Sequence, residues 1–458
     1  MTRPEDNEVG DRAATSTAEP GASGGGRQNG GRMGGAGVDM GGGGGGGTPI
    51  SLRNLRTFTS FKNPVFRLYY AAMLGQMAAM NMQMFARSFL VFTLTGSYSA
   101  LGIMALANAA PMMFFSLFGG VIADRVQKKY VLVVGQSASA LVSLGIAVSL
   151  TIGFMGADNA SSWWILVAAS LAQGTIMGLM MPSRQAMIFD IVGVDELMNA
   201  VALNTLGMNA LRIMAPALAG ILVASWGYEP VYYAMTGMYV IAAVLIWFMP
   251  HTGTISLGGK GALADIMDGL RYVKREPTIR LVLLISLVVV LLSMPYMMLL
   301  PGFAIDILDI GERGGGLLMM VSGFGAMVGS ITLASLPDKK RGLILMGGSL
   351  LLAVGLVGFS FSSSVMISFG VIFFVGIGQT VRMTLSNTLL QYYVEDEYRG
   401  RVMSLLFMEF GMTSFAVFGA GVMAEAIGLQ WSVGGLAIML VVATIGVMVF
   451  SPRIRKLD

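Results

Sequence analysis

Twelve long apolar segments recur along this 458-residue chain, and they constrain its fold more than any other feature. Each is at least as long as the roughly 20 residues that an α-helix needs to cross a bilayer core of ~30 Å. Because the segments are continuously apolar rather than alternating, they predict transmembrane helices and not barrel strands. The predicted spans are 67–94, 98–122, 130–154, 162–181, 200–226, 230–249, 280–301, 314–336, 343–362, 365–386, 401–427 and 430–450.

The composition agrees with lipid as the main solvent. The chain is 55% hydrophobic and 12% charged, whereas soluble domains have about a quarter charged residues. It contains no cysteine and one histidine, His251, so disulfides, thiolate chemistry and multi-histidine metal sites are excluded. The fold class predicted is an all-α membrane protein with two pseudo-symmetric six-helix bundles, without a metal or another cofactor.

Glycine and polar residues divide the chain into four predicted parts. Residues 1–50 form a glycine-rich tail, which includes the run Gly41–Gly47 and is expected to be disordered because it has nothing to bury. The tail lacks the apolar core of a signal peptide. Residues 51–249 and 279–458 are the predicted six-helix bundles, and the polar segment 250–278 is a cytoplasmic linker.

Lysine and arginine are distributed unevenly between the two sets of loops. With the start of the first span on the cytoplasmic side, most of the 29 bases fall in inner segments, while the outer loops receive Arg313 alone. By the positive-inside rule, this asymmetry predicts a multi-pass protein of the cytoplasmic membrane with both termini inside.

The two halves of the chain also repeat each other. Asp195–Glu196 aligns with Asp396–Glu397 and Gly220 with Gly421 at an offset of 201 residues, and Asp124 aligns with Asp338 at an offset of 214. Two repeated six-helix halves are a transporter architecture, in which the substrate site lies between the halves near the midplane.

A charged turn between the second and third spans carries a motif. Gly120-x3-Asp124-Arg125-x2-Lys128-Lys129 resembles the signature loop of the major facilitator superfamily. The stretches LTGSYSALGIM (94–104), PSRQAMIFDIVGVDELMNAVALNTLGMNALRIMAPALAGIL (182–222), DGLRYVKREPTIR (268–280) and NTLLQYYVEDEYRGRVMSL (387–405) are similar to its branch of macrolide and enterobactin exporters and transmembrane secretion effectors. One departure is Gln127, where the superfamily usually has glycine.

The resemblance implies export, driven by the proton gradient, and a conformational latch. In the family, the loop acid contacts the other half near the start of the eleventh span, so Asp124 is expected to meet Arg399 or Arg401. The simpler alternative is that Asp124 caps the next helix and the bases anchor the loop. The latch hypothesis involves Gly120, Asp124, Arg125, Lys128, Lys129, Asp338, Arg399 and Arg401.

Charges inside the spans are candidates for proton coupling, because such residues are costly in lipid and usually face a cavity or a partner. The candidates are Arg87, Arg212 and Glu409. A carboxyl group in a low-dielectric site can load and release protons near neutral pH, which favours Glu409 as the carrier. The alternative is a fixed structural pair with Arg87 or Arg212. Asp306 and Asp309 are expected to be solvated at the outer mouth.

Polar residues within the spans are candidates for the substrate pathway, although each is as well explained by hydrogen bonding between helices. Asn204, Asn209 and Arg212 match the family's NxxxxNxxR pattern. The many methionines favour a plastic apolar cavity over a copper pathway. The pathway candidates are Gln76, Asn81, Gln83, Asn108, Gln136, Asn204, Asn209, Gln379 and Arg382.

The leading functional hypothesis is a secondary active exporter of amphipathic small molecules of the drug, macrolide or siderophore class, acting as a proton antiporter and as a monomer. The expected partners are the small-molecule substrate, protons and the lipid bilayer, with no nucleic acid. An importer of the same fold and a non-transporting membrane receptor or scaffold remain alternatives. An enzyme is disfavoured, and an ATP-driven pump is disfavoured because no GxxxxGK[ST] loop is present.

Overall fold

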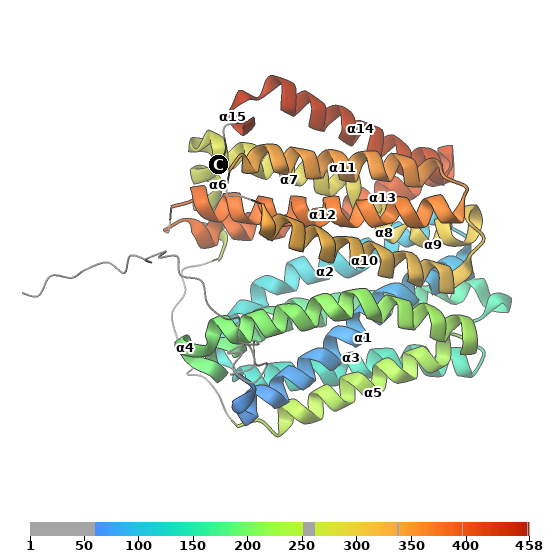
Figure 1. Ribbon diagram of the computed structural model, residues 1–458. Coiled ribbons are helices and arrows are strands. Elements are labelled where there is room, and N and C mark those ends of the chain that lie inside the picture. Colours follow the sequence, from blue (N-terminus) through green and yellow to red (C-terminus); the bar gives the residue numbers. More distant parts are fainter. Residues whose placement is uncertain (1–59, 251–261, 337–338, 396, 456, 458) are drawn as a thin grey trace, which may run out of the picture. The chain divides into compact units, whose positions relative to one another are not determined.

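The computed structural model describes residues 60–250, 262–336, 339–395, 397–455 and 457. The predicted tail, His251 and residues 251–261 of the predicted linker lie outside the described residues. Within the described ranges the chain forms helices joined by short turns, and no strand occurs among these residues (Figure 1). This agrees with the all-α fold that the apolar spans predict.

A first group of helices covers the described residues up to 250. Asn63 caps its first helix, since the Asn63 Oδ1 accepts a hydrogen bond from the Val65 N–H at 2.9 Å. That helix ends at Gly96, whose φ of 60° is left-handed, and Ser97 caps the next one. The elements are α1 (Pro64–Thr95), α2 (Tyr98–Arg125), α3 (Lys128–Thr151), the 3₁₀ helix η3 (Ala157–Trp163), α4 (Trp164–Trp226) and α5 (Tyr228–Trp247).

A second group covers the described residues from 262 onward. The amphipathic helix α6, in the predicted linker, packs against α13 through stacked rings of Tyr272 and Tyr398, whose centroids are 4.2 Å apart. The elements are α6 (Ala262–Arg275), α7 (Pro277–Ser293), α8 (Pro295–Met298), α9 (Leu300–Gly302), the π-helix η4 (Phe303–Ile307), α10 (Gly311–Ser335), α11 (Arg341–Phe361), α12 (Val365–Tyr393), α13 (Arg399–Ile427), α14 (Leu429–Phe450) and α15 (Pro452–Arg455).

Helix α4 contains two predicted spans, 162–181 and 200–226, and the residues that connect them are also helical. A straight helix of its 63 residues would be about 95 Å long, three times the thickness of a bilayer core. Neighbouring residues of α1 show that it reverses direction: the Tyr69 hydroxyl donates to the Arg184 carbonyl and the Tyr70 hydroxyl to the Leu203 carbonyl. The chain therefore turns back between residues 184 and 203.

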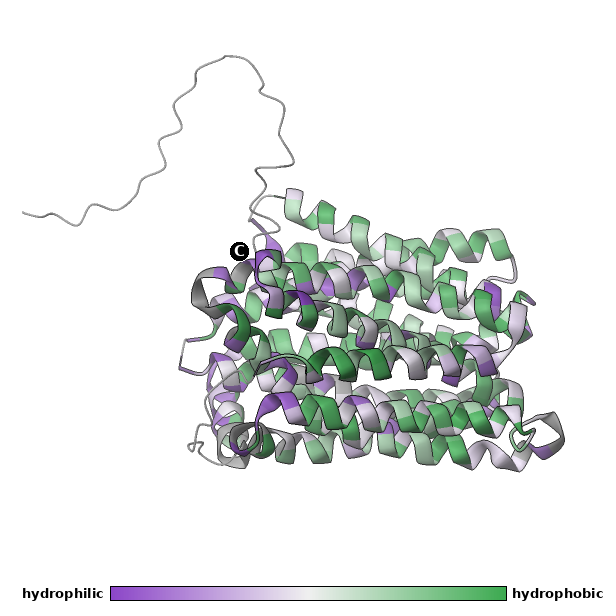
Figure 2. Ribbon diagram, turned by 90° about the horizontal axis from the view of Figure 1, so that it is seen from below, coloured by the Kyte–Doolittle hydropathy of each residue, from purple (hydrophilic) through white to green (hydrophobic). Residues whose placement is uncertain are grey.

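Eleven helical segments of the described residues are long and apolar enough to cross a membrane, as judged by length and composition. Helix α1, which covers the predicted span 67–94, is not among them but is 32 residues long. Large apolar side chains such as Leu141, Val442 and Phe450 are exposed, and Figure 2 shows hydrophobic residues along the helices and hydrophilic ones gathered towards their ends. This pattern is typical of a surface that faces lipid.

The two groups meet along two helix pairs, α2 with α13 and α4 with α10. Both approaches depend on a glycine, because a Cβ at Gly421 would lie 2.5 Å from the Tyr98 carbonyl oxygen and one at Gly220 would lie 2.5 Å from the Glu312 carbonyl oxygen. Gly220 and Gly421, which the internal repeat aligns, therefore occupy equivalent positions. We call the end of the bundle with the α1–α2 turn the Gly96 end, and the end with the α2–α3 turn the Gln127 end.

Candidate functional site

A buried carboxyl group lies in the middle of the second group. Glu409 of α13 is 5% exposed, and its Oε2 accepts a hydrogen bond from the Ser286 hydroxyl of α7 at 2.8 Å. Arg382 of α12, which is 2% exposed, donates from Nη1 to the same hydroxyl at 3.5 Å. Three helices thus bring a carboxylate, a hydroxyl and a guanidinium together away from water.

This cluster is incompletely hydrogen-bonded. Among the described residues, the Glu409 Oε1 and the Arg382 Nε are buried and have no hydrogen-bond partner. An unpaired carboxylate oxygen in the interior disfavours a permanently charged structural pair. The arrangement can accommodate a proton on Glu409, because the neutral carboxyl group no longer needs its full set of donors.

The cation beside Glu409 differs from the partners considered in the sequence analysis. Arg87 of α1 lies in the first group, where its Nη1 donates to the Ser170 hydroxyl of α4 at 3.1 Å. Arg212 of α4 is exposed, and in the second group it lies within electrostatic range of Tyr296. The structure therefore pairs Glu409 with Arg382, through Ser286, rather than with Arg87 or Arg212.

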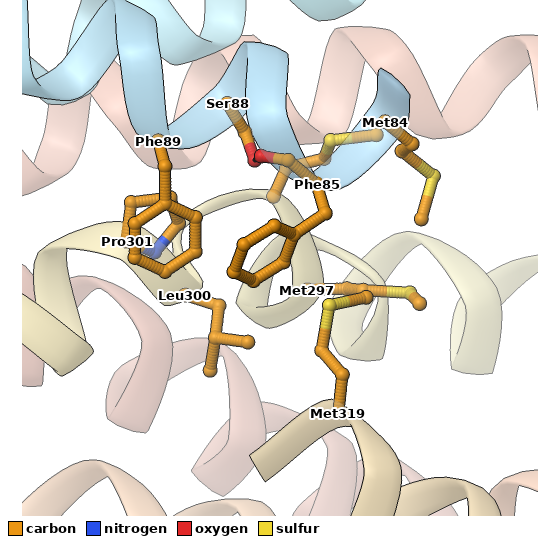
Figure 3. Close-up of a pocket in the computed structure, with 9 residues that line it drawn as sticks. Met84, Phe85, Ser88, Phe89, Met297, Leu300, Pro301 and Met319 are labelled. Carbon is orange, nitrogen blue, oxygen red and sulfur yellow. Dashed lines mark hydrogen bonds between the residues drawn. The ribbon is translucent and has the colours of Figure 1, made fainter. Parts of the chain in front are cut away.

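An apolar plug lies between α1 and the short helices α8 and α9, next to α10 (Figure 3). Phe85 and Phe89 of α1 point towards Leu300 and Met319 in this view. The side chains fill the interface so that no water-sized space remains. The residues that line it are Met84, Phe85, Ser88, Phe89, Met297, Met298, Leu300, Pro301 and Met319.

Hydrogen bonds to carboxylates tie the two groups together at the Gly96 end. Glu425 of α13 accepts from the Ser97 hydroxyl at 2.6 Å and from the Ser99 N–H at 3.2 Å, at the N-terminus of α2. A carboxylate at a helix N-terminus is favourable because it meets the orphan N–H groups and the positive end of the helix dipole.

Two tyrosines of the first group add equivalent contacts. The Tyr98 hydroxyl donates to the Asp306 Oδ2 at 2.5 Å, and the Tyr228 hydroxyl donates to the Glu312 Oε1 at 3.0 Å. Asp306 is exposed, as the sequence analysis expected, but it also accepts the hydrogen bond from Tyr98 of α2. The hydrogen bonds that the structure describes between the two groups thus lie at the Gly96 end.

The charged turn at the Gln127 end is described only in part. The structure does not describe the side-chain surroundings of Gly120 and Asp124, and Asp338 lies outside the described residues. The latch between Asp124 and α13 therefore stays a prediction. Arg125 is exposed. Arg399 donates to the Gln391 carbonyl at 3.5 Å, and the Arg401 guanidinium lies 5.3 Å from the Tyr398 ring centroid.

The two lysines of this turn contact their own helix group. Lys128 forms an ion pair of 2.5 Å with Asp190 of α4. Lys129 donates to the Met249 carbonyl, just beyond the C-terminus of α5, and lies over the Trp247 ring. These contacts join α3 to α4 and α5, so both lysines have a structural role within the first group.

Removing one partner of the Lys128–Asp190 pair is expected to destabilise the first group. The side chains are 17% and 13% exposed, so Lys128→Met leaves a mostly buried carboxylate, at a cost of about 1–3 kcal/mol after allowance for solvent screening. The midpoint of thermal unfolding in detergent should fall, and Lys128→Met with Asp190→Asn should recover most of the loss. Lys62→Met, at an exposed position, is the control; equal midpoints for all variants would contradict the structural role.

The predicted pathway residues are divided between several places. Gln76, Gln83 and Gln136 are buried within the first group, where Gln83 accepts from the Tyr239 hydroxyl at 3.2 Å. Other amides contact neighbouring residues: Asn81 donates to the Met77 carbonyl, Asn108 to the Ser170 carbonyl and Asn204 to the Met208 sulfur. Asn209 is exposed. Gln379 and Arg382 lie in the second group, where Gln379 accepts from the Tyr296 hydroxyl at 3.4 Å.

Several contact residues were missed by the sequence analysis, namely Ser286, Tyr296, Glu312 and Glu425. A serine or tyrosine in an apolar span carries no signal, because it needs no charged partner. Glu312 and Glu425 lie at helix ends, where acids are common.

Comparisons with known proteins agree with this architecture. The family model described as transmembrane secretion effector matches residues 55–458. The staphyloferrin A transporter of Staphylococcus aureus is 24% identical over 370 residues, covering 80% of this chain and 91% of that protein. The multidrug efflux pump Tap of Mycolicibacterium fortuitum is 24% identical over 413 residues, covering 87% and 98%.

Solved structures show the same fold. The crystal structure of the nucleoside transporter NupG superposes with a TM-score of 0.66 at 11% identity, covering 84% of this chain and 98% of that one. With the family match, the helical spans and the repeated halves, this similarity identifies a transporter and not an enzyme. The chain belongs to the transmembrane secretion effector family of the major facilitator superfamily.

Proposed function

We propose that the chain is a proton-coupled exporter of amphipathic small molecules that works by alternating access. The observation that carries this proposal is the buried cluster of Glu409, Ser286 and Arg382, with one unpaired carboxylate oxygen in the middle of the second group. A group of this kind has two comparable states, charged beside Arg382 or protonated and neutral, and the exchange between them couples proton movement to a conformational change.

Export is supported by one of the named relatives, the multidrug efflux pump Tap. The excess of bases in the predicted inner segments supports an orientation with the Gly96 end outside and both termini in the cytoplasm. In this orientation, the plug and the carboxylate contacts close the outer side. The two bundles, 51–249 and 279–458, are proposed to rock about the α2–α13 and α4–α10 contacts.

The amphipathic cargo class is supported by the surfaces between the groups. An open apolar groove of about 390 Å³ lies between α2 and α13, and its wall contains Met113, Phe114 and Phe415. With the methionines of the plug, it offers flexible, polarisable side chains that adapt to varied apolar shapes.

The proposal is tested by accumulation of fluorescent amphipathic dyes and macrolides in pump-deficient bacterial cells that express the chain. Lower accumulation than in control cells, reversed by a protonophore, is the expected result. Higher accumulation would establish import by the same fold. Equal accumulation for every compound, with the protein confirmed in the membrane, would contradict a transport function for these cargos.

A further inference from the structure

The charges deep within the membrane helices are mostly positive. Within the described membrane-crossing parts of the helices, away from the turns, the charged residues are three arginines and one glutamate. They are Arg87, Arg212, Arg382 and Glu409. Since each uncompensated charge is costly in lipid, an interior with this imbalance favours an anion as its additional partner.

The arginines differ in how far they are compensated. Arg382 has Glu409 nearby and Arg87 has the Ser170 hydroxyl. No ion pair with Arg212 occurs among the described residues, and Arg212 is exposed, so its guanidinium is accessible without local rearrangement.

Arg212 lies beside the contact between the two groups. Its neighbour Ile213 packs against Gly323 of α10, and the Arg212 charge acts on the Tyr296 hydroxyl of α8. Tyr296 also donates to Gln379 of α12, so polar groups of α4, α8 and α12 gather at this level. Met297, the residue after Tyr296, belongs to the plug.

A cation therefore stands next to an apolar, methionine-rich surface at the junction of the two groups. A guanidinium binds a carboxylate or another oxyanion through paired N–H donors, and the plug offers adaptable contacts to an apolar body. A cationic amphipath would instead bring a second positive charge next to Arg212. Like charges brought close together cost several kcal/mol.

We propose that the cargo is an amphipathic anion, with its negative group bound to Arg212 and its apolar part against the plug residues Phe85, Met297 and Met319 when the plug opens. This proposal rests on the proposed transport function, and it specifies the charge class of the cargo and a residue that recognises it. Bound anion then stabilises the loaded state, because it neutralises the charge of Arg212, which has no ion-pair partner among the described residues.

The test uses two probes that share a fluorophore and a five-carbon chain but have opposite charges, dansyl-6-aminohexanoate and dansylcadaverine. Binding of each to the purified full-length chain is measured by the rise in dansyl fluorescence. The wild type is expected to bind the anion more tightly than the cation. Arg212→Gln is expected to weaken anion binding by roughly tenfold to a hundredfold, the contribution of hydrogen bonds to a charged group.

Matched variants separate charge recognition from general damage. Arg212→Lys should retain part of the anion affinity, and Arg313→Gln, which removes an exposed base of α10, should leave both affinities unchanged. Equal wild-type affinity for the two probes, no binding of the anion, or unchanged anion affinity in Arg212→Gln would overturn the proposal.

Transport of the same probes in cells distinguishes this inference from the proposed function. Charge-selective binding that depends on Arg212, without protonophore-sensitive export, would support the anion site and contradict the exporter. Protonophore-sensitive export of dansylcadaverine, with the anion excluded, would support the exporter and overturn the anion site.

Discussion

Glu409→Gln is expected to abolish cargo-driven proton release while the protein still inserts into the membrane and binds cargo. Glutamine has nearly the shape of a protonated glutamate, and its amide can donate where the carboxyl O–H would. It keeps the Ser286 contact but cannot lose a proton, so the cluster beside Arg382 stays in one of its two states. Uphill transport needs both states and should fall to the level of membranes without the protein.

The measurement uses inside-out membrane vesicles with an acidic lumen and a pH-sensitive dye. Cargo added outside should release protons from vesicles with the wild-type chain and not from those with Glu409→Gln. Exchange of labelled for unlabelled cargo, which needs no net proton movement, should survive. Glu397→Gln, at an exposed position before α13, is the control. Proton release at the wild-type rate by Glu409→Gln would exclude Glu409 as the proton carrier.

The sequence predicted Glu409 but not its surroundings, for a physical reason. A carboxylate in the middle of an apolar span is conspicuous because lipid penalises it, whatever lies beside it. Its partners are set by which helix faces meet: Ser286 lies 123 residues away along the chain, on a different helix from Arg382. Arg87 and Arg212 were equally plausible partners until the packing of the helices was known.

The spans themselves were predictable because each apolar run must be helical to satisfy its backbone in lipid. The predicted spans 98–122 and 401–427, for example, match α2 and α13 to within a few residues at each end. The separate spans 162–181 and 200–226 predicted the chain reversal that α4 makes between residues 184 and 203, but not that the connection between them is helical as well. The alignment of Gly220 with Gly421 was visible in the sequence, but its meaning, two close approaches between the groups, required the structure.

Gly421→Leu is expected to hold the protein open at the Gly96 end and to abolish transport. A Cβ at this position would lie 2.5 Å from the Tyr98 carbonyl oxygen and 3.3 Å from the Ser99 Cα, so α2 and α13 have to separate. The contacts of Glu425 with Ser97 and Ser99, one turn further along α13, are then lost. Overpacking costs about 1–3 kcal/mol, which shifts a two-state equilibrium by roughly 5- to 150-fold.

The absence of cysteine from the chain makes this opening measurable. Ser88→Cys places one thiol in the plug, and a membrane-impermeant maleimide added to the outside of intact cells should label it faster in Gly421→Leu than with Gly421 unchanged. Gly419→Leu is the matched control, because a Cβ there meets nothing within 4 Å. Equal labelling rates in the two leucine variants would show that the Gly421 contact does not close the Gly96 end.

Gly220→Leu extends the test to the second interface. Its Cβ would lie 2.5 Å from the Glu312 carbonyl oxygen, so α4 and α10 should separate as α2 and α13 do, and the Tyr228–Glu312 hydrogen bond should break. If the groups move as rigid bodies, separation at either interface exposes the same plug, and both variants should label Ser88→Cys faster. Faster labelling with Gly421→Leu alone would instead indicate a local distortion of α13, since a Cβ at Gly220 also approaches the Phe85 ring of the plug to 3.2 Å and would expose the plug if α4 and α10 separated.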